Sequence, residues 1–327
     1  MAASGLDPST IFPFPLDDFQ LESIDALNQG HSVVVSAPTG SGKTLVGEYA
    51  IHRALAHGQK VFYTTPLKAL SNQKLRDFRE AYGDDNVGLM TGDLSVNREA
   101  SIVVMTTEIV RNMLYAEASE HDDPLADVEA VVLDECHYMN DSQRGTVWEE
   151  SIIHCPPSVQ LVALSATVAN AGQLTDWIEK VHGPTTLVLS DYRPVPLQFS
   201  FCSAKGLHPL LNDAGTGLHP NCKVWRAPKG HKRKGRSAKP PQPEPPPISF
   251  VVAQMAERDM LPAIYFIFSR RGCDKAVRDL GIQCLVNKEE QARIRARLKA
   301  YSSDNPEAVR DGIHADALLR GIAAHHA

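Results

Sequence analysis

Ala37-Pro38-Thr39-Gly40-Ser41-Gly42-Lys43-Thr44 is the stretch that decides the fold. It follows the β-branched run Val33-Val34-Val35, typical of a buried strand, and precedes residues 45–55, whose apolar side chains recur at helical spacing. A strand, a glycine-rich turn and a helix in this order form the context of a phosphate-binding loop. Gly40 and Gly42 can adopt backbone angles closed to other residues, so that amides at the helix start face an anion.

Two side chains of this loop suit a nucleoside triphosphate. Lys43 would place its charge on the outer phosphates, and the Thr44 hydroxyl would hold Mg²⁺. Ala37 departs from the general G-x-x-x-x-G-K-[ST] pattern, which has glycine there. The alternative is a glycine-rich turn with an unrelated lysine, and the flanking strand and helix argue against it. The predicted ATP-binding residues of this loop are Ala37, Pro38, Thr39, Gly40, Ser41, Gly42, Lys43 and Thr44.

The bulk composition is that of a globular protein. The 327 residues suffice for about two domains, and 43% hydrophobic and 22% charged content are ordinary. A net charge of −6 indicates no global affinity for nucleic acid, although a local groove can still be basic. No C-x-x-C pair occurs among the six cysteines, so we expect no structural metal. With no signal peptide and no apolar run long enough for a bilayer, we expect a cytoplasmic protein without a membrane partner.

Short apolar runs alternate with helical stretches after the loop. This order predicts an α/β fold with a parallel sheet covered by helices on both faces. The expected strands are 61–65, 102–106, 131–133, 161–164 and 187–189, and the expected helices are 18–28, 67–78, 108–117 and 174–181. The first domain, 1–195, should end where Pro194 and Pro196 break regular structure.

Residues 196–259 are predicted to be a linker that starts with one more short strand, 196–200. Within it, 223–239 holds eight lysines and arginines and no acid, and 240–247 holds six prolines. This insertion should be disordered or extended; it could bind RNA phosphates, but a solvated insertion is the favoured interpretation. A strand at 263–268 and helices at 273–280 and 291–300 predict a second α/β domain over 260–327, less than half of the roughly 150 residues such a domain needs.

Asp134-Glu135-Cys136-His137 follows the apolar run 131–133. A carboxylate at the end of a buried strand beside a phosphate loop can hold Mg²⁺, so Asp134 joins Thr44 as a candidate metal ligand. Glu135 could orient and deprotonate the attacking water. A solvated strand end is the alternative, but the position about 90 residues after the loop favours a catalytic pair. Ser165-Ala166-Thr167 ends the next strand, and its short hydroxyls could hydrogen-bond the metal site and a neighbouring domain.

These motifs, in this order, resemble the superfamily-two helicases of the DExH-box type. The chain most resembles the superkiller group of RNA helicases, whose eukaryotic members work with the RNA exosome. The resemblance runs from about Phe12 to the C-terminus, apart from the insertion. It implies a RecA-like ATP-binding domain at 1–195 and a partial second RecA-like domain at 260–327.

The resemblance also implies roles for individual residues. Phe14 would stack on adenine and Gln20 would read its edge. Catalysis would rest on Lys43, Asp134, Glu135 as the base and His137, which would link the nucleotide site to the RNA side; without the family, His137 would be read as a packed core histidine. Ser165 and Thr167 would couple hydrolysis to movement. Residues in segments that contact the RNA backbone would be Thr65, Pro66, Lys68, Thr91, Gly92, Asp93 and Thr107.

The segments assigned to the RNA backbone have an alternative role in capping helices. Thr and Asp are also good helix caps, and backbone amides at helix starts bind phosphates, so both roles can hold together. Such contacts do not read sequence, so binding should be largely sequence-independent and salt-sensitive.

The segment containing Arg144-Gly145 and Trp148-Glu149 also resembles the group, and we interpret it as packing beside the DExH box.

The family's second domain normally continues past the histidine pair seen here at 325–326. Downstream segments, one of which carries arginines that reach the γ-phosphate, do not occur in these 327 residues. An arginine finger is worth about 10³ to 10⁵ in rate, or roughly 4 to 7 kcal/mol of barrier. We therefore expect a chain truncated within its second domain that binds ATP and Mg²⁺ but hydrolyses slowly.

The sequence favours an ATP-dependent RNA helicase that acts on single-stranded or partly duplex RNA. A related DNA helicase is one alternative, because the phosphate loop and the DExH box do not separate the two substrates. A second alternative is an ATP- and RNA-binding fragment without unwinding activity. A small-molecule kinase is disfavoured, since no lid-like arginine cluster follows the loop.

Overall fold

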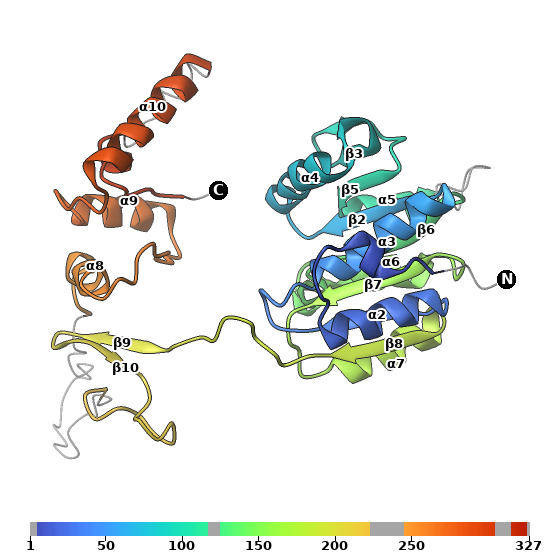
Figure 1. Cartoon of the computed structure of the whole chain (residues 1–327), viewed down its shortest axis with the longest axis horizontal. Helices are drawn as coiled ribbons and strands as arrows, with labels where there is room; N and C mark the ends of the chain where they lie inside the picture. Colours follow the sequence, from blue (N-terminus) through green and yellow to red (C-terminus); the bar gives the residue numbers. More distant parts are fainter. Residues whose placement is uncertain (1–4, 117–124, 223–244, 305–314, 326–327) are drawn as a thin grey trace, which may run out of the picture. The chain divides into compact units, whose positions relative to one another are not determined.

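The computed structural model describes residues 5–116, 125–222, 245–304 and 315–325. The chain divides into two compact units, Met1–Pro196 and Leu197–Ala327, which are described separately (Figure 1). The basic run predicted at 223–239, and most of the proline run after it, lie outside the described residues.

The first unit is built on one sheet. Within the described residues its strand order is β4-β3-β5-β2-β6-β7-β1-β8, and every neighbouring pair is parallel except β3 and β4 (Figure 1). The strands are β1 (Ser32–Ser36), β2 (Lys60–Thr65), β3 (Val87–Met90), β4 (Ser95–Val96), β5 (Ile102–Thr106), β6 (Val128–Leu133), β7 (Gln160–Ser165) and β8 (Thr185–Leu189).

Strand register brings three strand ends together. β7 lies between β1 and β6, with Ser36 opposite Ser165 and Leu133 opposite Ala163. Because all three strands are parallel, their carboxyl ends lie at the same edge of the sheet. That edge therefore carries the phosphate loop after β1, the acidic pair after β6 and the Ser165 segment after β7.

Helices cover both faces of this sheet. Successive side chains of a strand point to opposite faces, and Val33 and Val35 belong to one buried cluster while Val34 belongs to the other. The first cluster packs against α2, α3 and α4, and the second against α5, α6 and α7. The helical elements of this unit are α1 (Pro8–Ile11), α2 (Asp18–Asn28), α3 (Thr44–His57), α4 (Lys68–Tyr82), the 3₁₀ turn η1 (Asp84–Asn86), α5 (Thr107–Ala116), the 3₁₀ turn η3 (Cys136–Asn140), α6 (Gly145–His154) and α7 (Ala171–Val181).

The predicted α/β fold, with a mostly parallel sheet flanked by helices, is confirmed for this unit. The continuous apolar runs predicted its central strands because strands covered on both faces bury every side chain, as all five residues of β1 and of β5 do. The short strands β3 and β4 were not predicted, since four and two residues give too little pattern. None of the described helices combines the length and the apolar character that crossing a bilayer requires.

The second unit is sparser. Its described elements are β9 (Ser200–Ser203), β10 (Gly206–Pro209), α8 (Ile248–Ala256), α9 (Arg270–Asp279), α10 (Lys288–Asp304) and α11 (Ala315–Leu318). The two strands form an antiparallel hairpin, and a small apolar cluster joins Val277 and Leu280 to Ala317 and Ile322. Helix α8 falls inside the stretch predicted as a linker, where the preceding prolines concealed it.

Two strand predictions in this unit are wrong. Residues 263–268 form no strand in the part of the chain that the structure describes, and Ile264 and Phe266 are 81% and 82% exposed. A strand needs a hydrogen-bonded neighbour, and the local apolar pattern cannot supply one. The strand expected at 196–200 is displaced, because residues 196–199 are not in a strand and β9 begins at Ser200. Pro196 has no N–H to donate to a sheet.

Truncating a core side chain of the first unit should destabilise it strongly. Leu164 of β7 is fully buried, so we expect Leu164→Ala to lower the free energy of unfolding by about 2 to 5 kcal/mol. Ile153 of α6 is 49% exposed, and Ile153→Ala should stay within about 0.5 kcal/mol of the parent. Urea unfolding followed by tryptophan fluorescence measures both changes, and equal losses for the two variants would contradict the assigned core.

Candidate nucleotide site

The glycine-rich loop between β1 and α3 has the backbone geometry of an anion-binding turn. Gly40 and Gly42 have φ of +84° and +85°, a region that residues with a Cβ rarely occupy. In the part of the chain that the structure describes, the amides of Gly40, Gly42 and Lys43 donate to no carbonyl or side chain. They are therefore available to an anion at the start of α3.

The charge at this loop comes from Lys43. Its Nζ donates to the carbonyls of Ala37 at 2.8 Å and Pro38 at 3.0 Å, which folds the amine over the loop. Burial lowers the pKa of Lys43, while the nearby Glu135 and Asp134 carboxylates act in the opposite direction.

The loop also holds a buried hydroxyl, Ser41 Oγ, with no hydrogen-bond partner among the described residues. An unpaired buried donor is costly, so a ligand oxygen there would satisfy it.

The acidic pair is held by backbone conformation and by a core tyrosine. Glu135 has φ of +52°, which turns the chain sharply as it leaves β6. The Asp134 carboxylate accepts from the Glu135 amide at 2.9 Å and, through its other oxygen, from the Tyr63 hydroxyl at 2.9 Å. Burial raises the pKa of Tyr63 well above its usual value, so the hydroxyl remains a donor to the carboxylate. Tyr63 also interacts with the side chain of Thr44.

The phosphate loop and the acidic pair line one cavity. Its volume is about 440 Å³, within the size range of small-molecule sites. The side chains and backbone around it come from β1–α3, from the end of β6 and from α4. Its lining residues are Thr39, Gly40, Gly42, Lys43, Thr44, Leu70, Gln73, Lys74, Asp134 and Glu135.

Helix α4 contributes residues that the sequence did not assign to this site. Leu70, Gln73 and Lys74 line the cavity, although the sequence assigned this region only to the nucleic-acid side. The Lys74 amine also lies 5.4 Å from the centre of the Tyr63 ring. The spacing of residues 70, 73 and 74 places them on one face of the helix, but the local sequence does not indicate that this face is turned toward the loop.

Arg193 was also not predicted as a site residue; its guanidinium donates to the carbonyl of Thr39 at 3.2 Å.

His137 joins the acidic pair to the segment after β7. Its Nδ1 lies 3.3 Å from a Glu135 carboxylate oxygen and accepts from the Ala166 amide at 3.3 Å. One ring nitrogen cannot donate to the carboxylate and accept from the amide at the same time. Ser165 donates to the carbonyl of Ala166 at 2.8 Å, whereas Thr167 is exposed. His137 thus lies between the candidate base and the predicted coupling segment.

The two residues predicted to hold adenine differ in environment. Gln20 is buried; its amide donates to the carbonyl of Gly42 at 3.1 Å and accepts from the Asp17 amide at 2.9 Å. It therefore supports the phosphate loop directly. Phe14 is 53% exposed, with its ring 6.0 Å from that of Phe12, and is free to stack on a flat ligand.

The predicted nucleic-acid residues separate into buried and exposed groups. Thr65, Pro66 and Thr107 are buried, and the Thr107 hydroxyl donates to the carbonyl of Thr65 at 3.4 Å. These side chains hold the turn after β2 and cannot themselves reach a ligand. Lys68 and Asp93 are exposed and form an ion pair, which brings the α4 start beside the segment of Thr91 and Gly92.

Comparison with known proteins identifies a family and several relatives of this chain. Residues 17–174 match the family described as DEAD/DEAH box helicase. The chain is 44% identical over 356 residues to a DExH-box ATP-dependent RNA helicase, DExH15 chloroplastic, of Arabidopsis thaliana, covering 97% of this chain and 30% of the relative. It is 43% identical over 339 residues to the probable helicase HelY of Mycobacterium tuberculosis, covering 96% and 36%. It is 39% identical over 329 residues to the exosome RNA helicase MTR4 of Homo sapiens, covering 96% and 31%. The chain thus spans about a third of the length of these relatives.

The contact between Gln20 and the loop can be tested at two glycines. Alanine at position 40 or 42 incurs a left-handed backbone penalty of roughly 1 to 2 kcal/mol. A Cβ on Gly40 meets nothing within 4 Å, whereas a Cβ on Gly42 lies 2.8 Å from the Gln20 amide nitrogen. We expect Gly42→Ala to lose about 1 kcal/mol more unfolding free energy than Gly40→Ala, because the hydrogen bond from Gln20 is displaced.

Chemical denaturation of the two alanine variants, alone and combined with Gln20→Ala, measures this difference. Removing Gln20 should abolish the extra loss at position 42 and leave the loss at position 40 unchanged. Equal losses for the two alanine variants in the parent chain, where Gln20 is present, would contradict the assigned contact.

Proposed function

We propose that this chain, whose residues 17–174 are a DEAD/DEAH box helicase domain, binds and hydrolyses ATP and uses that cycle to move along or unwind RNA. The observation that carries the proposal is the single cavity shared by Lys43 and Thr44 of the phosphate loop and by Asp134 and Glu135. A triphosphate bound by the loop places its terminal phosphate within reach of a general base.

Each end of the nucleotide has candidate partners in this proposal. The loop amides and the Lys43 amine bind the phosphates. Phe14 stacks on the adenine, and Gln20 holds the loop through Gly42. Glu135 orients and deprotonates the attacking water, and its contact with His137 connects that step to Ala166.

The chain also offers a place for Mg²⁺. Thr44 and Asp134 both line the cavity and supply the oxygen ligands this ion prefers. Tyr63, whose hydroxyl donates to one Asp134 oxygen, fixes the orientation of the carboxylate in the manner of groups that support a metal ligand. Bound there, Mg²⁺ would supply charge neutralisation at the phosphates.

Replacing the candidate base tests the hydrolytic step. Glu135→Gln keeps the size of the side chain but cannot accept a proton, so single-turnover ATP hydrolysis should fall by about 10²- to 10⁴-fold. Binding of a fluorescent ATP analogue should stay within about twofold of the parent. The exposed Glu22 of α2 gives a matched control, since Glu22→Gln should change neither quantity. Hydrolysis at the parental rate in Glu135→Gln would remove Glu135 from the proposed mechanism.

RNA is the proposed substrate because two of the relatives named above are described as RNA helicases. A related DNA helicase remains the second candidate, since HelY is described only as a probable helicase. ATPase stimulation by single-stranded RNA and by DNA of the same sequence separates the two. A strand-displacement assay separates both from an ATP- and RNA-binding module without unwinding activity.

The exposed lysine at the start of α4 is the proposed phosphate contact. Replacing Lys68 by alanine should reduce the slope of log affinity for single-stranded RNA against log salt by about 0.7, the value for one lost phosphate contact. Lys60, at the opposite end of β2 and paired with Glu99, provides the control. Fluorescence anisotropy across a salt series measures both slopes. A slope unchanged in Lys68→Ala, or reduced equally in Lys60→Ala, would contradict this assignment.

We also propose a cytoplasmic location. The six cysteines all lie within the described residues and none forms a disulfide. Cysteines that form no disulfide, two of them in the buried core of the first unit, suit a reducing compartment.

A further inference from the structure

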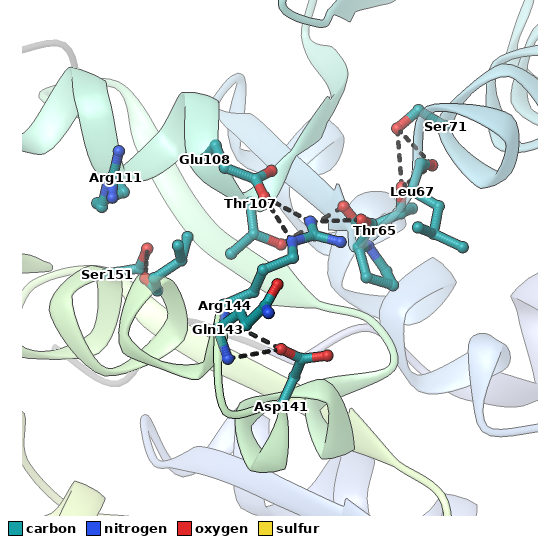
Figure 2. Close-up of polar contacts among 12 residues, drawn as sticks. Thr65, Leu67, Ser71, Thr107, Glu108, Arg111, Asp141, Gln143, Arg144 and Ser151 are labelled. Carbon is teal, nitrogen blue, oxygen red and sulfur yellow. Dashed lines mark hydrogen bonds and ion pairs between the residues drawn. The ribbon is translucent and has the colours of Figure 1, made fainter.

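The loop that joins the DExH box to α6 was expected to contribute packing, but its main contacts are polar. Arg144, the last residue before α6, extends its guanidinium toward the ends of β2 and β5 (Figure 2). One Nη donates to the carbonyl of Pro66 at 2.7 Å. Nε donates to a carboxylate oxygen of Glu108 at 3.1 Å, and the same Nη also contacts that oxygen.

This guanidinium therefore joins two backbone segments that are distant in sequence. Pro66 belongs to the turn between β2 and α4, and Glu108 belongs to the first turn of α5. Thr107 adds a buried hydrogen bond to the carbonyl of Thr65 beneath them (Figure 2). The buried side chains of Thr65, Pro66 and Thr107 do not reach a ligand, but helix starts present backbone amides that can bind phosphates. The spacing of the two segments would then set where phosphates bind.

The backbone of Arg144 is anchored to Asp141, the residue that follows η3. An Asp141 carboxylate oxygen accepts from the amides of Gln143 and Arg144, at 2.9 and 3.0 Å (Figure 2). The Gly145 amide donates to the carbonyl of Asp141 at 2.8 Å. A Cβ on Gly145 would collide with the carbonyl oxygen of Met139 in η3, so only glycine allows this close approach.

A continuous set of contacts leads from Arg144 back to the candidate base. The guanidinium lies 5.9 Å from the centre of the Trp148 ring, which stacks on Tyr138 at 6.3 Å. Tyr138 in turn lies 5.3 Å from the ring of His137, the partner of Glu135. These contacts form a continuous physical connection between η3 and the turn at Pro66.

We propose that Arg144 is a positioning residue that holds the turn after β2 and the start of α5 at the spacing needed to bind the RNA backbone and couples that spacing to the nucleotide site. This inference rests on the proposed function. The forked guanidinium reaches a carbonyl and a carboxylate together, which a lysine amine cannot reproduce. In this role Arg144 acts through the backbone of Pro66 and the side chain of Glu108.

The test uses the whole chain and the conservative variant Arg144→Lys. Fluorescence anisotropy with labelled single-stranded oligouridylate, with and without a non-hydrolysable ATP analogue, reports RNA affinity. We expect RNA affinity roughly tenfold weaker in Arg144→Lys and the effect of the analogue on RNA binding lost. Affinity for a fluorescent ATP analogue alone should stay within about twofold. Hydrogen exchange should be faster at residues 67–71 and unchanged in β1.

Arg111 provides a matched control on the neighbouring α5. It lies 3.6 Å from Glu150 of α6 and contacts Asn112, and no residue of the turn after β2 is among its partners in the described residues. Arg111→Lys should leave RNA affinity unchanged. Glu108→Gln should weaken RNA binding, and its effect should not add to that of Arg144→Lys.

The possible results are distinguishable. Parental RNA affinity in Arg144→Lys, or an equal loss in Arg111→Lys, overturns the inference, as does unchanged exchange at residues 67–71. If the parent chain binds no RNA, the proposed function fails, and accelerated exchange in Arg144→Lys no longer supports a role in RNA binding. Should Arg144→Lys lower the melting temperature, Glu108→Gln tests the same contact from the other side.

Discussion

The hydrogen-bond register among β1, β7 and β6 is the constraint on which the rest of this structure depends. Because the three strands are parallel and aligned at their carboxyl ends, a loop that follows one faces the residues that follow the others. A slip of one residue would turn every side chain of a strand to the opposite face. The buried clusters on both faces prevent such a slip, so the core fixes the geometry of the cavity.

Tyr63 shows how closely the core and the site are joined. It is fully buried in the cluster beneath α3 and α4, packing against Phe78, yet its hydroxyl reaches Asp134. The side chain that fills space under two helices also orients a candidate metal ligand.

Helix α4 likewise contributes to two regions, with Lys68 exposed at its start and Gln73 and Lys74 lining the cavity. The proposed nucleotide and nucleic-acid surfaces are thus separated by little more than one helical turn.

Much of the first unit could be predicted because its information is local. The glycines and Lys43 mark a loop, and apolar runs mark strands covered on both faces. Pairing is not local, which is why residues 263–268 were predicted as a strand and instead lack a neighbour among the described residues. The contacts of Tyr63 with Asp134 and of Arg144 with Pro66 join residues 71 and 78 positions apart, and no spacing rule predicts them.

The adjacent positions 144 and 145 are constrained for different reasons. Gly145 is fixed by excluded volume, because the carbonyl of Met139 occupies the space of any side chain. Arg144 is partly exposed, so many residues fit there without disturbing the core. Random substitution at Gly145 would therefore prevent folding. Random substitution at Arg144 would leave folded molecules that have lost only the contacts of its side chain. A screen for abundance would therefore detect substitutions at Gly145 alone, whereas a screen for activity would detect substitutions at both positions.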